Sequence, residues 1–290
     1  MTEEKASEEN LYFIDPHSSA EMARLINQDK LITSEIGGPL AGIPEQDLSG
    51  VQDILDIACG PGGWVMEVAF ALPATHAVGF DISPEMIAYA RAQARVQGLN
   101  NAEFHVMDMT QPFDFPGESF GLVNARLATG LLPPAQWPPY LAECLRILRP
   151  GGILRLTETE RILSNSQATE HIWELFTNAL KEAGQSFSPN GHLFCLIPML
   201  KRQLRDAGCT SLQERVDLIN YSAGEPSNPS FYENMRDAFQ LMQPFLLAYN
   251  TISPQELENC YQQALSDVRS ESFCAVSIFN TAWGYKPVGG

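Results

Sequence analysis

Short apolar runs alternate with stretches of helical periodicity from residue 53 to residue 158. The pattern predicts five strands: DILDIA (53–58), HAVGFD (76–81), EFHVMD (103–108), SFGLVNARL (119–127) and ILRLTE (153–158). Helices are expected between them at 64–72, 84–97 and 137–149. Because strands that alternate with helices form parallel sheets covered on both faces, this region predicts a Rossmann-like α/β core.

The alternation of short strands and helices ends after residue 160, where longer helical patterns dominate. Helices are expected at 168–184, at 196–207 and near 18–31, with more helical material inside 224–270 and further strands at 211–219 and 273–285. These two strands bring the expected sheet to seven, mostly parallel. We expect residues 49–160 to form the binding core of one α/β domain. Residues 1–48 would add a helix to a lid, and residues 161–290 would complete the domain with helical lid insertions at about 161–195 and 224–270.

Composition and charge narrow the range of functions. The 290 residues are 44% hydrophobic, which is enough for a large core, and the net charge of −17 argues against nucleic acid because phosphate binding requires a basic face. No run of about eighteen apolar residues occurs, and the N-terminus is acidic rather than signal-like, so we expect a soluble, cytoplasmic protein without a membrane span. The six cysteines are scattered without a Cys-x-x-Cys pair, which favours reduced thiols and no metal site. The chain is expected to be a monomer or a homodimer.

A glycine-rich loop follows the first expected strand. Its sequence is CGPGG (59–63), and Asp81 ends the second strand 21 residues after Gly60. A carboxylate at that place can accept both ribose hydroxyls, so a nucleoside ligand is implied. Val65 stands where a dinucleotide fingerprint requires its third glycine, and no Gly-Lys-Ser/Thr follows the loop. A nucleoside without phosphates therefore fits the loop better than a dinucleotide or a nucleoside triphosphate.

The ordered set of motifs from about residue 50 to residue 160 resembles a known family. ILDIACGPGGW, GFDISPEMIAYA, FHVMDM, FPGESFGLVNARL and LRILRPGGILRLTE follow one another as in the class I S-adenosylmethionine-dependent methyltransferases. The resemblance is to the ubiquinone/menaquinone-biosynthesis type, a subgroup that holds many small-molecule enzymes of bacteria. It implies S-adenosylmethionine as the cofactor, S-adenosylhomocysteine as the product, and no metal.

The resemblance also implies roles for individual residues. The loop residues Ala58, Cys59, Gly60 and Gly62 would pack against the methionine part of the cofactor, and Asp81 would hold the ribose hydroxyls. Ile82 and Met86 would lie along the adenine, while Asp108, with Met109 beside it, would accept from the adenine amino group. Asn124 and Arg126 would line the face on which the methyl group is transferred.

Substrate and catalytic groups are expected from the lid segments and from the strand ends. Tyr12, Arg126, Trp173 and Phe194 are candidates for shaping a substrate pocket. Aromatic residues at helical spacing, such as Trp173 and Phe194, are more often part of the core, and Tyr12 could instead form a hydrophobic staple for the next helix. Glu158 at the end of a strand and His192 in an expected loop are the candidates for a base. A base is needed only if the acceptor arrives protonated.

Three functions fit this pattern. The first is a methyltransferase that acts on a small apolar or aromatic molecule at an oxygen, carbon or nitrogen atom. The second is another transferase on the same scaffold, such as an aminopropyl transferase, which should show additional carboxylates near the transfer site. The third is a catalytically silent module that binds the cofactor and works through a partner.

Overall fold

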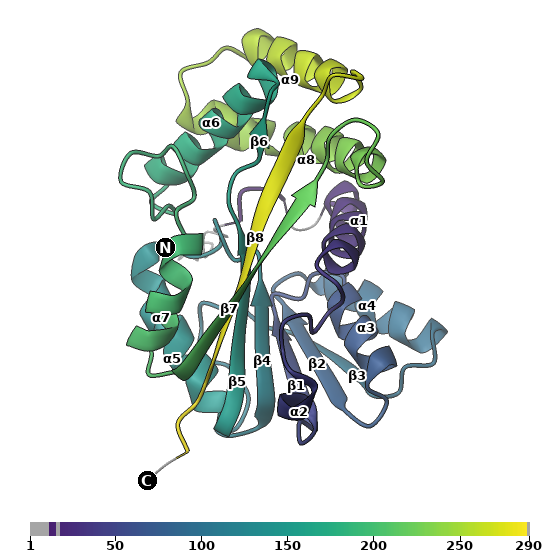
Figure 1. The fold of residues 1–290 in the computed structure, drawn as a ribbon, viewed down its shortest axis with the longest axis vertical. Coiled ribbons are helices and arrows are strands. Elements are labelled where there is room, and N and C mark those ends of the chain that lie inside the picture. Colours follow the sequence, from purple (N-terminus) through teal and green to yellow (C-terminus); the bar gives the residue numbers. More distant parts are fainter. Residues whose placement is uncertain (1–11, 16–17, 289–290) are drawn as a thin grey trace, which may run out of the picture.

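One eight-stranded sheet runs through the molecule (Figure 1). The computed structural model describes residues 12–15 and 18–288. Its strands follow the order β3-β2-β1-β4-β5-β8-β6, and β7 pairs with β8 off this path. They are β1 (Asp53–Ile57), β2 (His76–Asp81), β3 (Ala102–Val106), β4 (Phe120–Arg126), β5 (Leu148–Thr159), β6 (Leu163–Ser164), β7 (Thr210–Asn220) and β8 (Ala275–Tyr285).

The sheet is mostly parallel. Strands β1 to β5 pair in parallel, whereas β8 is antiparallel to β5, β6 and β7. This confirms the expected Rossmann-like sheet and adds one short strand, β6. Only two residues long, β6 is too short to show a periodicity in the sequence.

Helices cover both faces of the sheet, and a separate apolar core lies between the helices and each face. On one face lie α3 (Gly63–Ala71) and α4 (Pro84–Val96), and on the other lie α5 (Trp137–Ile147) and α7 (Leu200–Asp206). Trp64 is buried in the first core and Trp137 in the second. The remaining short helices are α2 (Glu45–Leu48), η1 (Pro134–Gln136) and η2 (Ile197–Met199).

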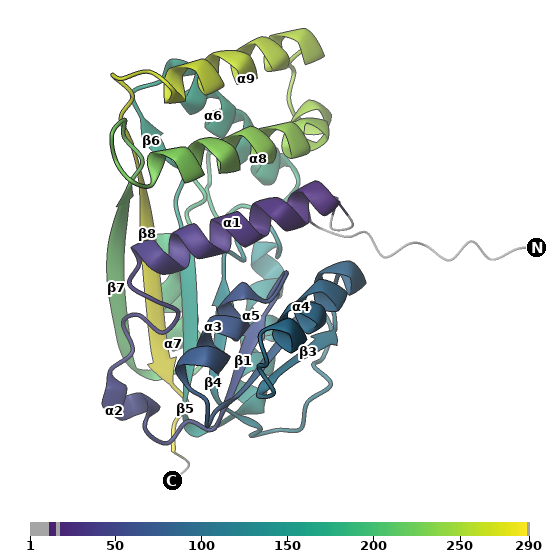
Figure 2. The same cartoon turned by 90° about the vertical axis from the view of Figure 1, so that its right-hand side faces the viewer.

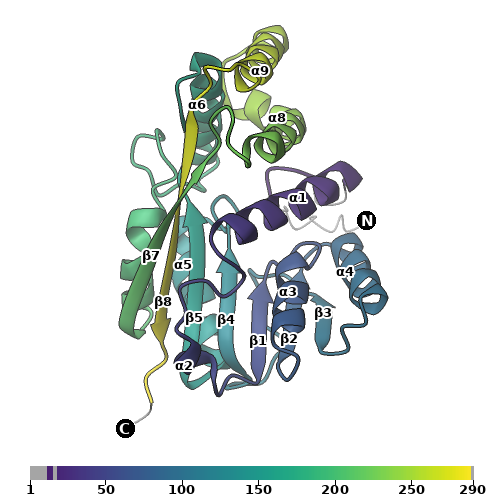
Figure 3. The same cartoon turned by 45° about the vertical axis from the view of Figure 1, so that its right-hand side comes forward.

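A third core joins the N-terminal helix to the helices of the late insertions. It packs α1 (Ser19–Glu35) with α6 (Gln167–Glu182), α8 (Asn228–Tyr249) and α9 (Pro254–Val268). Figures 2 and 3 show α9, α8 and α1 as successive layers over the strand ends, with α1 nearest to the sheet. We call α6, α8 and α9 the helical layer.

Several element boundaries differ from the sequence-based expectation. The helix expected near 18–31 extends to Glu35, and Ser18 caps its start by accepting from the Glu21 N–H. Strand β3 ends at Val106, so Asp108 lies in the following loop. No helix in the described part of the chain combines the length and the apolar character that a membrane-crossing segment requires.

Candidate active site

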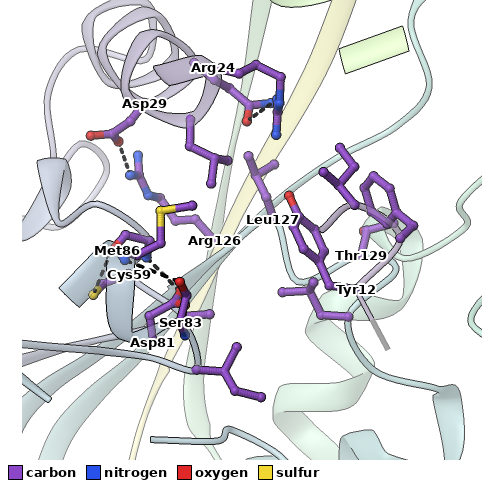
Figure 4. A pocket seen from close by; sticks show the side chains of 18 of the residues that line it. Tyr12, Arg24, Asp29, Cys59, Asp81, Ser83, Met86, Arg126, Leu127 and Thr129 are labelled. Carbon is purple, nitrogen blue, oxygen red and sulfur yellow. Dashed lines mark hydrogen bonds and ion pairs between the residues drawn. The ribbon is translucent and has the colours of Figure 1, made fainter. Parts of the chain in front are cut away.

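A cavity of about 610 Å³ lies between the carboxyl ends of the parallel strands and the helices above them. Its lower wall contains the loop after β1, the end of β2 and the end of β4, and its upper wall contains α1, α6 and α8. In an open α/β sheet this edge is where ligands bind, because the loops there diverge at the point where the strand order reverses. Figure 4 shows side chains from both walls turned toward one another.

The glycine loop forms part of the lower wall through its backbone. Ala58, Gly60 and Gly62 all have positive φ angles, of 53°, 53° and 79°. The backbone N–H of Gly60 donates to Asp81 Oδ2 at 2.9 Å, which ties the loop to the end of β2. Ala58, Cys59 and Gly60 line the cavity. The loop therefore presents its main chain to any ligand in the cavity.

Asp81 is held in place by two backbone donors. Its second oxygen accepts from the Ser83 N–H at 2.9 Å, and burial raises the pKa of its carboxyl above the ordinary value. The side chain lines the cavity together with Met86 from α4 and Ile82, which is 44% exposed. The fixed carboxylate of Asp81 is thus bordered by the apolar side chains of Ile82 and Met86.

The loop after β3 adds a second carboxylate to this wall. Asp108 accepts from both the N–H and the hydroxyl of Thr110 at 2.8 Å, and these contacts fix the turn. Asp108 and Met109 both line the cavity.

An ion pair connects the sheet to α1. Arg126 at the end of β4 is paired with Asp29 of α1 and donates to Thr33 Oγ1 at 2.9 Å. Arg126 and Asp29 both line the cavity, and Figure 4 shows them facing each other beside it. The pair is 13% and 14% exposed, so it is shielded from bulk water and holds α1 over the strand ends.

The upper part of the cavity is aromatic and apolar. Trp173 and Phe176 of α6, Phe239 of α8 and Phe194 all line it. Trp173 makes edge-on ring contacts with the other three at centroid distances of 5.8–6.0 Å. Such packing makes a rigid apolar chamber.

Comparisons with known proteins agree with this geometry. Residues 54–152 match the family described as "Methyltransferase domain". The demethylmenaquinone methyltransferase of Lactococcus lactis is 31% identical over 114 residues, which are 39% of this chain and 44% of that protein. This chain thus spans less than half of that relative's length. The N-methyltransferase gliN of Aspergillus fumigatus is 23% identical over 96% of this chain and 98% of its own.

Residues 54–152 form a class I S-adenosylmethionine-dependent methyltransferase domain. A phosphoethanolamine N-methyltransferase of Haemonchus contortus, solved with phosphomonomethylethanolamine and S-adenosylhomocysteine, shares the fold with a TM-score of 0.51. It is 16% identical, and the match covers 95% of this chain and 60% of that one. The likeness in fold therefore extends over the helical layer of this chain as well as its core.

Most of the predicted cofactor-binding and substrate-binding residues line the cavity. They are Ala58, Cys59, Gly60, Asp81, Ile82, Met86, Asp108, Met109 and Arg126 on the lower wall, with Tyr12, Trp173 and Phe194 above. Gly62 does not line the cavity. A Cβ there would come within 2.5 Å of Phe104, so glycine is required for packing and for the left-handed start of α3.

Asn124 also lies away from the cavity, and we leave it out of the site. It is fully buried within β4, where its amide donates to Asp56 Oδ1 at 2.7 Å and accepts from Arg155 at 2.6 Å. Burial raises the pKa of Asp56 to about 7 and lowers that of Arg155 to about 9. Asp56 lies beside Asn124 on the neighbouring strand and lines the cavity, whereas Asn124 is one pleat further from the strand end than Arg126.

Neither candidate base is placed to meet a substrate. Glu158 is 1% exposed and outside the cavity lining, and it accepts from the Ala128 N–H at 2.7 Å and from the Thr129 hydroxyl at 2.7 Å. His192 is exposed in a loop and also lies outside the lining. Strand alternation places Thr157 and Thr159 at the cavity and Glu158 on the opposite face.

Polar residues of α1 and α8 at the cavity were not foreseen. Arg24, Gln28 and Asp29 of α1 and Asn234 of α8 all line it. Helical periodicity predicted a helix near 18–31 but could not show which of its polar residues face inward. Among the described residues, no group of three or more His, Cys, Asp or Glu is arranged to hold a metal ion.

Proposed function

We propose that this chain transfers a methyl group from S-adenosylmethionine to a small apolar or aromatic molecule. The observation that carries the proposal is the continuity of the cavity, which extends from Gly60 and Asp81 on the sheet side to Trp173 and Phe239 on the helical side. A nucleoside cofactor and an aromatic acceptor could therefore lie side by side without solvent between them.

The residues of the lower wall suit the cofactor. Asp81 has a carboxylate directed at the cavity for ribose hydroxyls, and the backbone of Ala58, Cys59 and Gly60 allows close approach. Asp108 would accept from the adenine amino group, with Ile82, Met86 and Met109 along the ring. Arg126 could bind the carboxylate of the methionine part. When bound, the cofactor supplies a methyl group made electrophilic by its sulfonium.

The chain's own part is alignment and exclusion of water. The acceptor atom forms its bond to the methyl carbon as the carbon–sulfur bond breaks, and the electron pair of that bond remains on sulfur in S-adenosylhomocysteine. A proton on the acceptor is released to solvent, and neither Glu158 nor His192 lines the cavity to take it up. Nitrogen is the acceptor to test first, because the relative that aligns over 96% of this chain is named an N-methyltransferase.

The cavity is less suited to an aminopropyl transferase. Its carboxylates lie on the sheet side or, like Asp29, are paired with arginine, and the aromatic chamber among the described residues contributes none for a polyamine. The silent binding module would have the same cofactor site, so it is distinguished by turnover alone.

The proposal is tested by calorimetric titration with S-adenosylhomocysteine, first on the unaltered chain and then on Asp81→Asn. We expect micromolar binding that weakens about 100-fold in the variant, since a hydrogen bond to a charged group contributes about 1.5–3 kcal/mol. The exposed Asp114→Asn is the matched control and should bind normally. Equal affinity in Asp81→Asn would contradict the assigned site, and cofactor binding without methylation of any aromatic amine, phenol or amide would favour the silent module.

A further inference from the structure

A buried polar cluster lies in the upper wall of the cavity, where α1 meets α8. Arg24 is 5% exposed and forms an ion pair with Glu21, which is fully buried. Arg24 Nε donates to Glu21 Oε2 at 2.7 Å and Nη2 donates to Glu21 Oε1 at 2.6 Å. The hydroxyl of Tyr12 donates to the same carboxylate. Figure 4 shows Arg24 and Tyr12 reaching the cavity from different segments.

The remaining nitrogen of Arg24 orients two amide side chains. Nη1 donates to Gln28 Oε1 and to Asn234 Oδ1, both at 3.0 Å. A guanidinium group can only donate, so both amides must turn their oxygens toward Arg24 and their NH2 groups away from it. No hydrogen bond from either NH2 group is formed within the described residues.

Both amide side chains line the cavity beside its apolar chamber. Gln28 is one turn along α1 from Arg24, and Asn234 is one turn before Ala238 on the cavity face of α8. Met235 and Phe239, on the same helix as Asn234, also line the cavity. A ligand that excludes water from fixed donors at an apolar cavity wall, and leaves them unpaired, binds with a free-energy penalty. A ligand that fills this chamber should therefore supply an acceptor to them.

The charge of the cluster indicates which acceptor is suitable. The positive charge of Arg24 is balanced by Glu21, and Gln28 and Asn234 are neutral. An uncharged carbonyl oxygen matches two neutral donors, whereas a carboxylate would bring an uncompensated charge into the chamber.

We propose that Gln28 and Asn234 bind a carbonyl oxygen of the methyl acceptor, so that the substrates are aromatic amides, lactams or ketones. This inference rests on the proposed function and adds the substrate class. Arg24 acts through the amides as a positioning residue, because its hydrogen bonds set the direction of both NH2 groups.

The test compares ligand pairs that differ only by a carbonyl oxygen. The leading pair is 3,4-dihydroquinolin-2-one and 1,2,3,4-tetrahydroquinoline, within a panel of bicyclic aromatic lactams and their ring-CH2 analogues. Binding to the protein saturated with S-adenosylhomocysteine is measured by calorimetry or ligand-observed NMR. We expect the carbonyl compound to bind about tenfold more tightly, as two neutral hydrogen bonds would give.

Two variants remove the donors and retain the contact with Arg24. Asn234→Asp and Gln28→Glu each keep an oxygen for Arg24 and replace the NH2 group by an acceptor, so the carbonyl preference should disappear. The matched controls are Gln240→Glu on α8 and Asn27→Asp on α1, both exposed, and they should keep the preference. Unchanged affinity for S-adenosylhomocysteine verifies that each variant is folded.

The outcomes separate this inference from the proposed function. Equal binding of both partners of each pair, persistence of the preference in both donor variants, or binding of no panel member to the loaded protein would overturn the inference and leave the cofactor site standing. Failure of S-adenosylhomocysteine to bind the unaltered chain would instead overturn the proposed function and this inference with it.

Discussion

At the residue scale, the carboxylates around the cavity are distinguished by whether they reach it. Asp81 accepts from two backbone N–H groups and still lines the cavity. Glu158 accepts from Ala128 and Thr129 and does not reach it. Because Thr129 lines the cavity, Glu158 contributes by fixing the loop after β4 and not by moving a proton.

The titration of Glu158 should make stability depend on pH. Burial raises its pKa from 4.5 to about 7, so the folded chain binds this proton more tightly than the unfolded chain. The resulting stabilisation is fully present below pH 4.5 and is lost as the pH rises through 7. Relative to Glu158→Gln, we expect the free energy of unfolding of the unaltered protein to decrease by about 3 kcal/mol between pH 4 and pH 8. Urea denaturation across this range measures the difference, and a constant difference would disprove the assignment.

His192 provides a second prediction at this scale. Because its side chain is exposed and lies outside the cavity lining, His192→Ala should leave both kcat and KM within about twofold of the unaltered enzyme. Steady-state kinetics with the acceptor found in the binding panel would check this. A loss of about 100-fold or more in kcat would restore His192 as a base.

At the element scale, α1 is the helix on which the site depends most. It contacts α3 below and α8 above, and it contributes Arg24, Gln28 and Asp29 to the cavity. Its polar contacts with β4 are the pair between Asp29 and Arg126 and the hydrogen bond from Arg126 to Thr33. The helix therefore joins the sheet side of the cavity to its helical side.

Breaking that pair should loosen α1 specifically. In Asp29→Asn the charge of Arg126 loses its partner in a mostly buried place, and we expect the free energy of unfolding to decrease by about 1–3 kcal/mol. Backbone amides of α1 should exchange hydrogen faster, while those of α5 on the far face should not change. Hydrogen-exchange mass spectrometry reports both, with Asp114→Asn as the control. Unchanged exchange in α1 would show that this ion pair does not hold the helix in place.

At the scale of the whole molecule, the cavity lies where two separately packed bodies meet. The sheet has its own cores on its two faces, and the helical layer has a third core that includes residues of α1. A ligand that contacts both walls should therefore stabilise both bodies.

Hydrogen exchange with S-adenosylhomocysteine can test this coupling. At a ligand concentration of 100 times Kd the free energy of unfolding should rise by about 2.7 kcal/mol. Protection should increase in the glycine loop, in residues 127–131 and in α1. The exposed strand β7, none of whose residues lines the cavity, should be unaffected. Protection confined to the glycine loop would show that α1 does not close over the cofactor.

Local sequence features were sufficient for the core of the fold and for most of the residues on the sheet side of the cavity. Strands and helices between 53 and 158 have clear periodicities because each buries a continuous apolar face. Asp81 and the glycine loop could be located because the loop after the first strand and the end of the second meet at one sheet edge in this fold.

Other features depend on contacts between residues far apart in the chain. Asn124 and Arg126 are on the same side of β4, but Asn124 is hydrogen-bonded to Asp56 and Arg155 in the interior while Arg126 reaches the cavity. The alternation of side chains along β5 shows that the strand has two faces but not which of them meets the cavity. The sequence therefore could not show that Thr157 and Thr159, and not Glu158, line it. The orientation of Gln28 and Asn234 needs Arg24 to lie between helices that are 210 residues apart along the chain. The periodicity of a sequence shows which face of a helix or strand is buried. It does not show which distant elements pack together, and that packing determines which polar side chains line this cavity.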